Sequence, residues 1–201
     1  MLSPQLDLYR HLAPHMQDKR VLEVGFGTGF GTLQFMGYAR DITAIEPDID
    51  AVDFAVRCLN PLAIEWTHGN ILKPVWARGR RWDAVVMIEV LEHIGTWRMA
   101  LQHVCNLLTD DGALYISARN ANADLRKNDL HEREWRAQEF RDGMAEFFEF
   151  VQLFDYTLEE PMGTDTRQTP LVAIASYPKR TIEYGRQKKE VGSNQEHEAR
   201  V

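Results

Sequence analysis

The hydrophobic positions of the chain alternate between short apolar runs of strand length and longer stretches with helical spacing. In the longer stretches, apolar residues recur every three or four positions, as on one face of a helix. Strands that alternate with helices are typical of a parallel sheet covered by helices on both faces. The pattern predicts strands at residues 20–24, 41–46, 63–67, 82–88 and 113–117.

Helices are predicted between these strands, and a hairpin after them. The predicted helices are residues 6–16, 29–38, 48–58, 97–108 and 135–147, with Asp48 as the N-cap of the third. A turn at Asp111-Gly112 is expected before the fifth strand. Two late strands, 150–158 and 169–176, are expected to pair antiparallel. Together they indicate a doubly wound, Rossmann-like α/β domain with a seven-stranded, mostly parallel sheet and an antiparallel last strand.

The apolar pattern stops at Lys179. We therefore expect one domain at residues 1–178 and a disordered polar tail at 179–201, which has too few apolar residues to bury. No apolar run reaches the roughly 18 residues that span a bilayer, and the first 15 residues do not resemble a signal segment. These features predict a cytoplasmic protein with no membrane association.

Charge and cysteine content limit the classes of partner. The formal net charge of −7 does not favour nucleic acid, and the basic residues Arg78, Arg80 and Arg81 are interpreted as a solvated loop. A small-molecule partner is therefore preferred. Cys58 and Cys105 lie in apolar, helical runs and are predicted to be buried free thiols.

A glycine loop follows the first strand, with glycine at every second position: Gly25, Gly27 and Gly29. Glycine permits backbone angles that are closed to other residues and lets a ligand approach the main chain closely. A dinucleotide site needs a further glycine where Phe30 stands, and the Gly-Lys-Ser/Thr run of a phosphate-binding loop is absent from the sequence. The loop therefore favours a cofactor without a pyrophosphate.

Two carboxylates identify that cofactor more closely. Glu23, two positions before the first glycine, would attract an ammonium group and repel a phosphate. Glu46 ends the second strand, where a carboxylate accepts both hydrogens of a ribose diol. S-adenosylmethionine carries an ammonium group, a sulfonium and a ribose. A NAD-dependent oxidoreductase, the rival interpretation, is disfavoured by Glu23 and Phe30.

The motifs resemble those of class I S-adenosylmethionine-dependent methyltransferases. Residues 23–29 resemble the first motif of that family, 46–48 the ribose-binding strand end and 69–71 the adenine motif, and the likeness extends over residues 18–176. Asn70 stands where the family commonly has Asp. The resemblance implies a methyltransferase whose cofactor contacts are Glu23, Gly25, Gly27, Gly29, Glu46, Asn70, Ile71 and Glu89.

A second group of candidate residues follows the central strand. Glu89, Glu92 and His93 have the spacing i, i+3 and i+4, which places them on one face if a helical turn begins there. Two carboxylates and an imidazole can bind Mg²⁺ or Mn²⁺. Alternatively, His93 acts as a general base beside Glu92, or Glu92 and His93 merely begin a helix.

The family resemblance leaves the methyl acceptor open. Similar Glu-Val-x-Glu-His segments occur in ubiquinone-type and sugar O-methyltransferases, which implies a polar small-molecule acceptor with a hydroxyl group. They also occur in metal-dependent 2′-O-methyltransferases of small-RNA 3′ ends, in which His131 would be the fourth metal ligand. A third alternative is a non-catalytic subunit that binds S-adenosylmethionine. Residues 119–135 are expected to contact the acceptor.

Overall fold

The computed structural model describes residues 4–59, 64–123, 132–167 and 169–180. Its elements in chain order are α1 (Pro4–Leu12), η1 (Ala13–Met16), β1 (Arg20–Val24), η2 (Thr32–Phe35), β2 (Asp41–Glu46), α2 (Ile49–Phe54), η3 (Ala55–Leu59), β3 (Ile64–His68), η4 (Pro74–Ala77), β4 (Trp82–Ile88), η5 (Leu91–His93), α3 (Trp97–Leu107), β5 (Leu108–Ala118), α4 (Ala137–Ala145), β6 (Phe148–Phe154), β7 (Pro161–Met162) and β8 (Leu171–Pro178).

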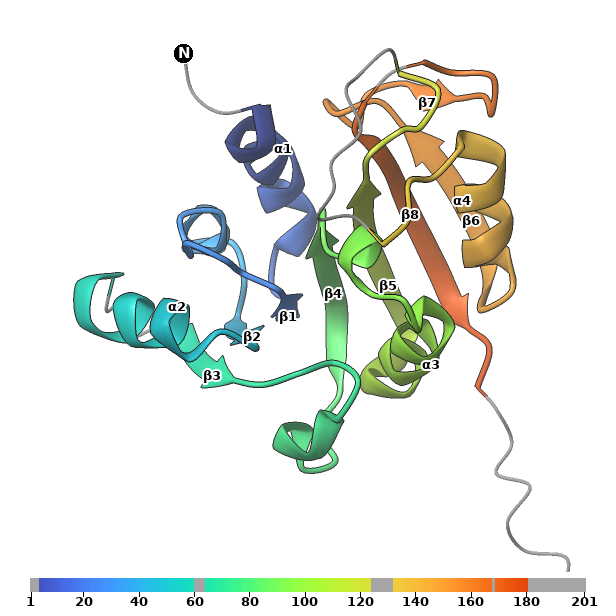
Figure 1. Ribbon diagram of the computed structural model, residues 1–201. Coiled ribbons are helices and arrows are strands. Elements are labelled where there is room, and N and C mark those ends of the chain that lie inside the picture. The colour runs from blue at the N-terminus through green and yellow to red at the C-terminus, as the bar shows by residue number, and fades with distance from the viewer. Residues whose placement is uncertain (1–3, 60–63, 124–131, 168, 181–201) are drawn as a thin grey trace, which may run out of the picture.

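One sheet contains all the described strands, in the order β3-β2-β1-β4-β5-β8-β6-β7. The five strands from β3 to β5 are parallel, whereas β8 lies antiparallel between β5 and β6 (Figure 1). The predicted α/β class, the mostly parallel sheet and the antiparallel pairing of the last two long strands are confirmed. The two-residue β7, which pairs with the end of β6, adds an eighth strand to the seven predicted.

Helices cover both faces of the sheet because each central strand is apolar on both sides (Figure 1). Successive side chains of a strand point to opposite faces. In β4, Val85 and Met87 pack with α3 and α4, whereas Val86 and Ile88 pack with α1 and α2. This double burial explains why β4 is the most continuous apolar run of the sequence.

The predicted helix at residues 29–38 is wrong. Only the short 3₁₀ turn Thr32–Phe35 forms there. Gly29 and Gly37 adopt φ values of 78° and 82°, which a right-handed helix does not permit, so these two glycines limit the helix at both ends. The glycine loop therefore leads into an irregular segment and not into a long helix.

The other predicted helices differ mainly at their ends. Asp48 caps α2 as predicted, because its Oδ1 accepts a hydrogen bond of 2.9 Å from the Asp50 amide. The turn predicted at Asp111-Gly112 lies inside β5, where the pairing with β4 shifts register between Trp82 and Ala84.

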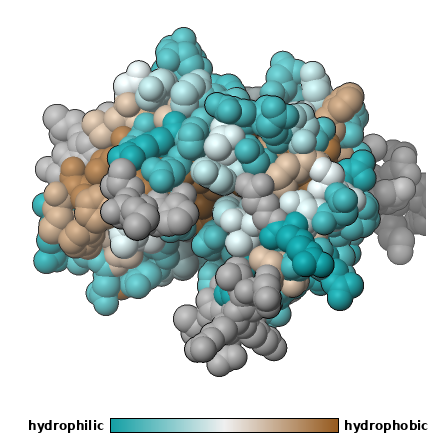
Figure 2. Space-filling view, turned by 90° about the horizontal axis from the view of Figure 1, so that it is seen from above, coloured by the Kyte–Doolittle hydropathy of each residue, from teal (hydrophilic) through white to brown (hydrophobic). Residues whose placement is uncertain are grey.

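Apolar surface remains exposed on the side of the molecule that carries α2 (Figure 2). The side chains of Ile49, Phe54 and Val56 are between 42% and 51% exposed. The helical spacing of this segment therefore brings only part of its apolar residues, Val52 and Ala55, into the core.

The end of the described chain is attached to the domain. The Lys179 amide donates to the Phe147 carbonyl at 2.7 Å, and Arg180 pairs with Asp110 at 2.6 Å. The first two residues of the predicted tail are thus held, and residues 181–201 lie outside the described residues. Cys105 is buried as predicted, but Cys58 is exposed because it faces outward at the end of η3. Within the described ranges, no helix combines the length and apolarity needed to cross a membrane.

Candidate functional site

A cavity of about 480 Å³ opens where β1, β2 and β4 end, and is here called the carboxyl-edge cavity. The strand order reverses between β1 and β4, and this is where doubly wound sheets leave a crevice. Its size is typical of small-molecule sites. It brings together six of the predicted site residues: Gly25, Glu46, Asn70, Ile71, Glu89 and His93.

The glycine loop requires its glycines. Gly25, Gly27 and Gly29 have φ values of 75°, 55° and 78°, in the left-handed region that other residues rarely adopt. At Gly25 an added Cβ would also lie 2.6 Å from Cγ2 of Val90. The absence of this atom lets the loop and the segment after β4 approach each other across the cavity.

Glu46 is held in place by the backbone of both neighbouring segments. Its Oε2 accepts from the Gly27 amide at 3.0 Å, and its Oε1 accepts from the Asp48 amide at 3.1 Å. A carboxylate has about four lone-pair positions, so each oxygen can still accept a further hydrogen bond. The structure therefore presents at the end of β2 an oriented carboxylate able to receive a diol.

The segment after β3 forms a rigid polar edge of the cavity. Asn70 Oδ1 accepts from the Leu72 amide at 2.8 Å, and the Asn70 carbonyl accepts from Trp76 Nε1 at 3.1 Å. Ile71 beside it is buried. Val90 and Ile94, which sequence reasoning missed, form the apolar wall opposite. Their only signal in the sequence is that they flank Glu92 and His93.

Glu23 lies fully buried beneath the glycine loop and does not itself line the cavity. The Tyr9 hydroxyl of α1 donates to its Oε1 at 2.6 Å. Among the described residues, its Oε2 has no hydrogen-bond partner. Burial raises the pKa of this carboxyl to about 7, against the hydrogen bond from Tyr9, which lowers it.

Glu89 directly follows β4, at the mouth of the cavity. Its φ of 54° turns the chain sharply, and the Ser117 hydroxyl accepts from its amide at 3.1 Å. Loss of solvent raises the pKa of Glu89, and the positive charges of Arg119 and His93 partly oppose this. His93 follows in η5 with its side chain exposed, so Glu89 and His93 both face the cavity.

Glu92 does not face the same way, which corrects the prediction of a shared helical face. The left-handed Glu89 cannot be part of a helix, and the 3₁₀ turn begins only at Leu91. Glu92 is fully buried, away from the cavity lining, with its backbone carbonyl accepting from Glu132 at 2.9 Å. Burial raises its pKa to about 7. This position does not support a direct catalytic role for its carboxyl.

The predicted metal ligands do not converge. Over the described ranges, no group of three or more His, Cys, Asp or Glu residues could hold a metal ion. Glu89, Glu92 and His93 therefore form no metal site, since Glu92 is turned into the interior. His131, the predicted fourth ligand, lies outside the described residues. Of the four ligands that the metal-dependent RNA alternative requires, Glu92 is thus turned away from the cavity that Glu89 and His93 line.

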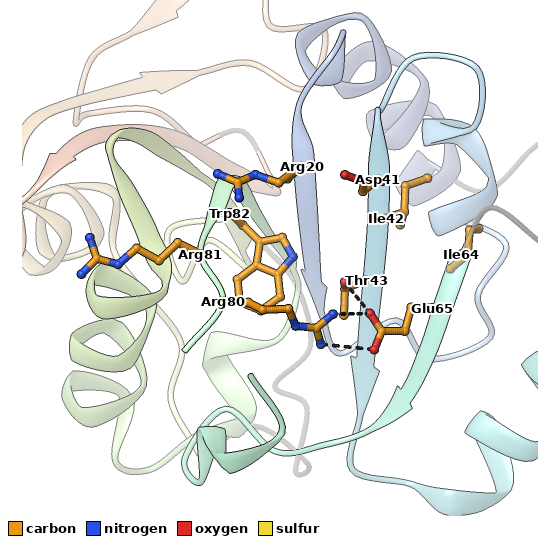
Figure 3. A pocket seen from close by; sticks show the side chains of 9 residues that line it. All are labelled: Arg20, Asp41, Ile42, Thr43, Ile64, Glu65, Arg80, Arg81 and Trp82. Atoms are coloured by element: carbon orange, nitrogen blue, oxygen red, sulfur yellow. Dashed lines mark hydrogen bonds and ion pairs between the residues drawn. The ribbon is translucent and has the colours of Figure 1, made fainter. Parts of the chain in front are cut away.

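A second cavity, of about 400 Å³, lies at the opposite edge, where β1 to β4 begin, and is here called the amino-edge cavity (Figure 3). Its charges are paired within the protein. Arg80 binds both carboxylate oxygens of Glu65 and lies over the ring of Trp82, and Arg20 pairs with Asp83 at 3.2 Å. The basic cluster of the sequence is thus partly used to tie a loop to the sheet.

Comparisons with known proteins identify the family of the chain. A family model described as a methyltransferase domain matches residues 5–157. A probable S-adenosylmethionine-dependent methyltransferase of Mycobacterium tuberculosis is 29% identical over 137 residues, which are 66% of this chain and 49% of that protein. A ubiquinone biosynthesis O-methyltransferase of Glaesserella parasuis is 29% identical over 115 residues, 52% of this chain and 47% of that protein. The chain spans about half the length of these relatives.

Solved structures share the fold. The N-methyltransferase NodS of Bradyrhizobium japonicum, in complex with S-adenosyl-L-homocysteine, has a TM-score of 0.64 at 20% identity. The match covers 87% of this chain and 86% of that one. At this identity the likeness supports the fold alone.

Proposed function

The chain belongs to the methyltransferase domain family, and we propose that it uses S-adenosylmethionine to methylate a hydroxyl oxygen of a polar small molecule. The observation that carries the proposal is the carboxyl-edge cavity, in which residues from four separate segments converge. The resemblance of the sequence assigned five of the cavity residues to this cofactor: Gly25, Glu46, Asn70, Ile71 and Glu89. The relative named as an O-methyltransferase supports oxygen as the acceptor atom.

The residues of the cavity fit the parts of this cofactor. Glu46 would accept the ribose hydroxyls, and Asn70 and Ile71 would bind the adenine edge and face. At Gly25 a Cβ would meet Val90, so only glycine lets the loop backbone lie at this wall of the cavity, where the sulfur of the cofactor would lie against it. The bound cofactor supplies a methyl group on a positively charged sulfur.

His93 is the proposed general base. A hydroxyl oxygen becomes a better nucleophile if its proton moves to a neighbouring group as the new bond to carbon forms. His93 lies at the mouth of the cavity, which Glu89 also lines. The methyl group would come from the bound cofactor, whose sulfur would keep the electron pair of the carbon–sulfur bond. Alignment of the two reactants supplies the rest of the rate enhancement.

The function is tested by binding and turnover together. Wild-type protein is expected to bind S-adenosylhomocysteine in calorimetry and to release it from S-adenosylmethionine when given pooled hydroxylated small molecules. Pooled amines and short RNA are the comparison arms. Binding without turnover on any pool would indicate a non-catalytic subunit, and binding of NAD instead would contradict the proposal.

His93→Ala is expected to lower turnover by about 10²–10⁴-fold, the usual contribution of a general base, with little change in cofactor affinity. His15→Ala is the matched control, because His15 lies before β1 at the opposite edge of the sheet. The measurement is single-turnover methyl transfer with the acceptor found above. Wild-type rates in His93→Ala would remove this residue from the mechanism.

A further inference from the structure

The side chain of Tyr9, in α1, lies directly against the segment that carries the glycine loop. A Cβ at Gly31 would come within 2.5 Å of the Tyr9 ring, so the ring fills the space that this glycine leaves. The ring also packs on Phe35 of η2, with 5.5 Å between centroids. Tyr9 itself is only 5% exposed. Its ring is thus fixed by packing, which fixes the position of its hydroxyl.

That hydroxyl has one polar partner among the described residues, Oε1 of Glu23, at 2.6 Å. Both residues are buried, and hydrogen bonds to a carboxylate in such surroundings are short and strong. The other oxygen of Glu23 has no hydrogen-bond partner in the described part of the chain. A buried carboxylate with one oxygen bound and one unpartnered is oriented but not satisfied.

We propose that Tyr9 is a positioning residue, which holds Glu23 beneath the glycine loop so that the negative charge of its carboxylate acts on the ammonium group of the cofactor across the loop. The inference rests on the proposed function. It assigns to α1 a role in cofactor recognition, through a residue that does not line the cavity. In this proposal Tyr9 affects only the binding of the ammonium end. Loss of its hydroxyl should therefore leave the affinity for cofactor fragments without this end unchanged.

The surroundings of Glu23 explain why it needs such a residue. Burial and the negative charge of Glu46 both disfavour its ionised form, whereas the hydrogen bond from the Tyr9 hydroxyl favours it. The buried hydroxyl of Thr32 lies near enough to favour it as well, although it makes no hydrogen bond of regular geometry to Glu23. The negative charge of Glu89 also acts on Tyr9, and it favours the protonated form of the Tyr9 hydroxyl. Tyr9 therefore remains the donor, and its hydrogen bond helps Glu23 to carry the negative charge that an ammonium group requires.

The test compares two ligands on three proteins. S-adenosylhomocysteine carries the ammonium group, and 5′-methylthioadenosine shares the adenosine and the sulfur but lacks it. Calorimetry gives both dissociation constants for wild type, Tyr9→Phe and Tyr115→Phe. Phenylalanine keeps the ring that packs on Gly31 and removes only the hydroxyl. Tyr115 is the matched control, a buried tyrosine of the same core whose hydroxyl binds Lys19 instead.

In Tyr9→Phe the dissociation constant of S-adenosylhomocysteine is expected to rise about tenfold, as for loss of one hydrogen bond to a charged group. The dissociation constant of methylthioadenosine in Tyr9→Phe is expected to stay within about twofold of the wild-type value. In Tyr115→Phe the dissociation constants of both ligands are expected to resemble those of wild type. The rise of S-adenosylhomocysteine affinity with pH is also expected to move to higher pH in Tyr9→Phe, because the pKa of Glu23 increases when its donor is lost.

Two results would overturn the inference. Equal losses of affinity for both ligands in Tyr9→Phe would show that Tyr9 has a merely structural role. Unchanged affinity for both ligands would show that Glu23 does not need Tyr9. In both cases wild-type binding of S-adenosylhomocysteine would leave the proposed function standing. If wild type binds neither ligand, the proposed function fails and the inference fails with it.

Discussion

Two glutamates close to the carboxyl-edge cavity, Glu23 and Glu92, are fully buried, and burial raises the pKa of each to about 7. Their environments differ in one respect. Glu23 receives a hydrogen bond from Tyr9, whereas no described residue makes a hydrogen bond of regular geometry to either carboxylate oxygen of Glu92, although the amides of Glu92 and Arg119 lie near enough to lower its pKa. Glu23 is therefore better suited than Glu92 to hold a negative charge for a ligand.

This difference predicts how stability changes with pH. The pKa of Glu92 in the folded protein, about 7, lies above its ordinary value of 4.5, so the folded state keeps a proton that the unfolded chain releases between these values. The stability that this group contributes is full below about pH 4.5 and is lost as pH rises to about 7. Glu92→Gln is therefore expected to be more stable than wild type above pH 7, by about 1–3 kcal/mol.

Chemical denaturation at about pH 5 and pH 8 measures this. The increase in unfolding free energy of Glu92→Gln over wild type should appear at the higher pH. It should shrink at the lower pH, where the side chain at position 92 is neutral in both folded proteins. Glu149→Gln, an exposed glutamate of β6, is the control and should show no such difference. A destabilised Glu92→Gln at the higher pH would mean that the Glu92 carboxylate has a partner that stabilises its charge.

Helix α1 illustrates how an element that does not line the cavity contacts the segments around the glycine loop. Its apolar residues Leu8, Tyr9 and Leu12 pack on the face of the sheet that α2 also covers. Tyr9 adds contacts with Gly31 and Glu23 on either side of the glycine loop. The helix and the loop are thus expected to be ordered together.

Gly31→Ala tests this contact between elements. Gly31 has an ordinary φ of −65°, so an alanine there is not strained, and its Cβ would instead meet the Tyr9 ring at 2.5 Å. Such overpacking typically destabilises by about 1–3 kcal/mol. Hydrogen exchange is expected to increase mainly in α1 and at residues 25–35. Gly95→Ala is the control, since its φ is not positive and an added Cβ would meet only Glu132 Oε2 at an ordinary contact distance of 3.9 Å. Unchanged exchange in Gly31→Ala would show that α1 is not coupled to the loop.

At the scale of the whole molecule, the site depends on the order of the strands. Residues that end β1, β2 and β4 meet only because β1 and β4 are neighbours at the point where the order reverses. A ligand that bridges these segments binds the folded chain alone. It therefore stabilises the whole domain by mass action.

S-adenosylhomocysteine at a hundred times its dissociation constant is expected to stabilise the protein by about 2.7 kcal/mol. For a chain of this size that raises the melting temperature by about 5–10 °C. Glu46→Ala should lose most of this shift at the same ligand concentration, because the ribose contact is gone. The control is Glu65→Ala, which removes a carboxylate from the amino-edge cavity instead. This variant should keep the full ligand-induced rise in melting temperature. A full shift in Glu46→Ala would exclude Glu46 from the ribose contact.

The sequence by itself determined the strands, their parallel arrangement and the positions of six cavity residues, because these depend on local patterns. Apolar runs buried on both faces mark β1, β2 and β4, and the residues that follow parallel strands meet at one edge of the sheet. Gly25 could be identified because a left-handed turn permits few other residues.

Only the tertiary structure decided where the polar side chains near that edge point. The spacing of Glu89, Glu92 and His93 indicated one helical face, but the left-handed Glu89 turns the chain, and Glu92 enters the core while His93 stays outside. The contact between Tyr9 and Glu23 joins residues 14 positions apart on different elements, so no local pattern encodes it. Periodicity records which residues are buried, whereas the partner of a buried polar group is set by packing between elements.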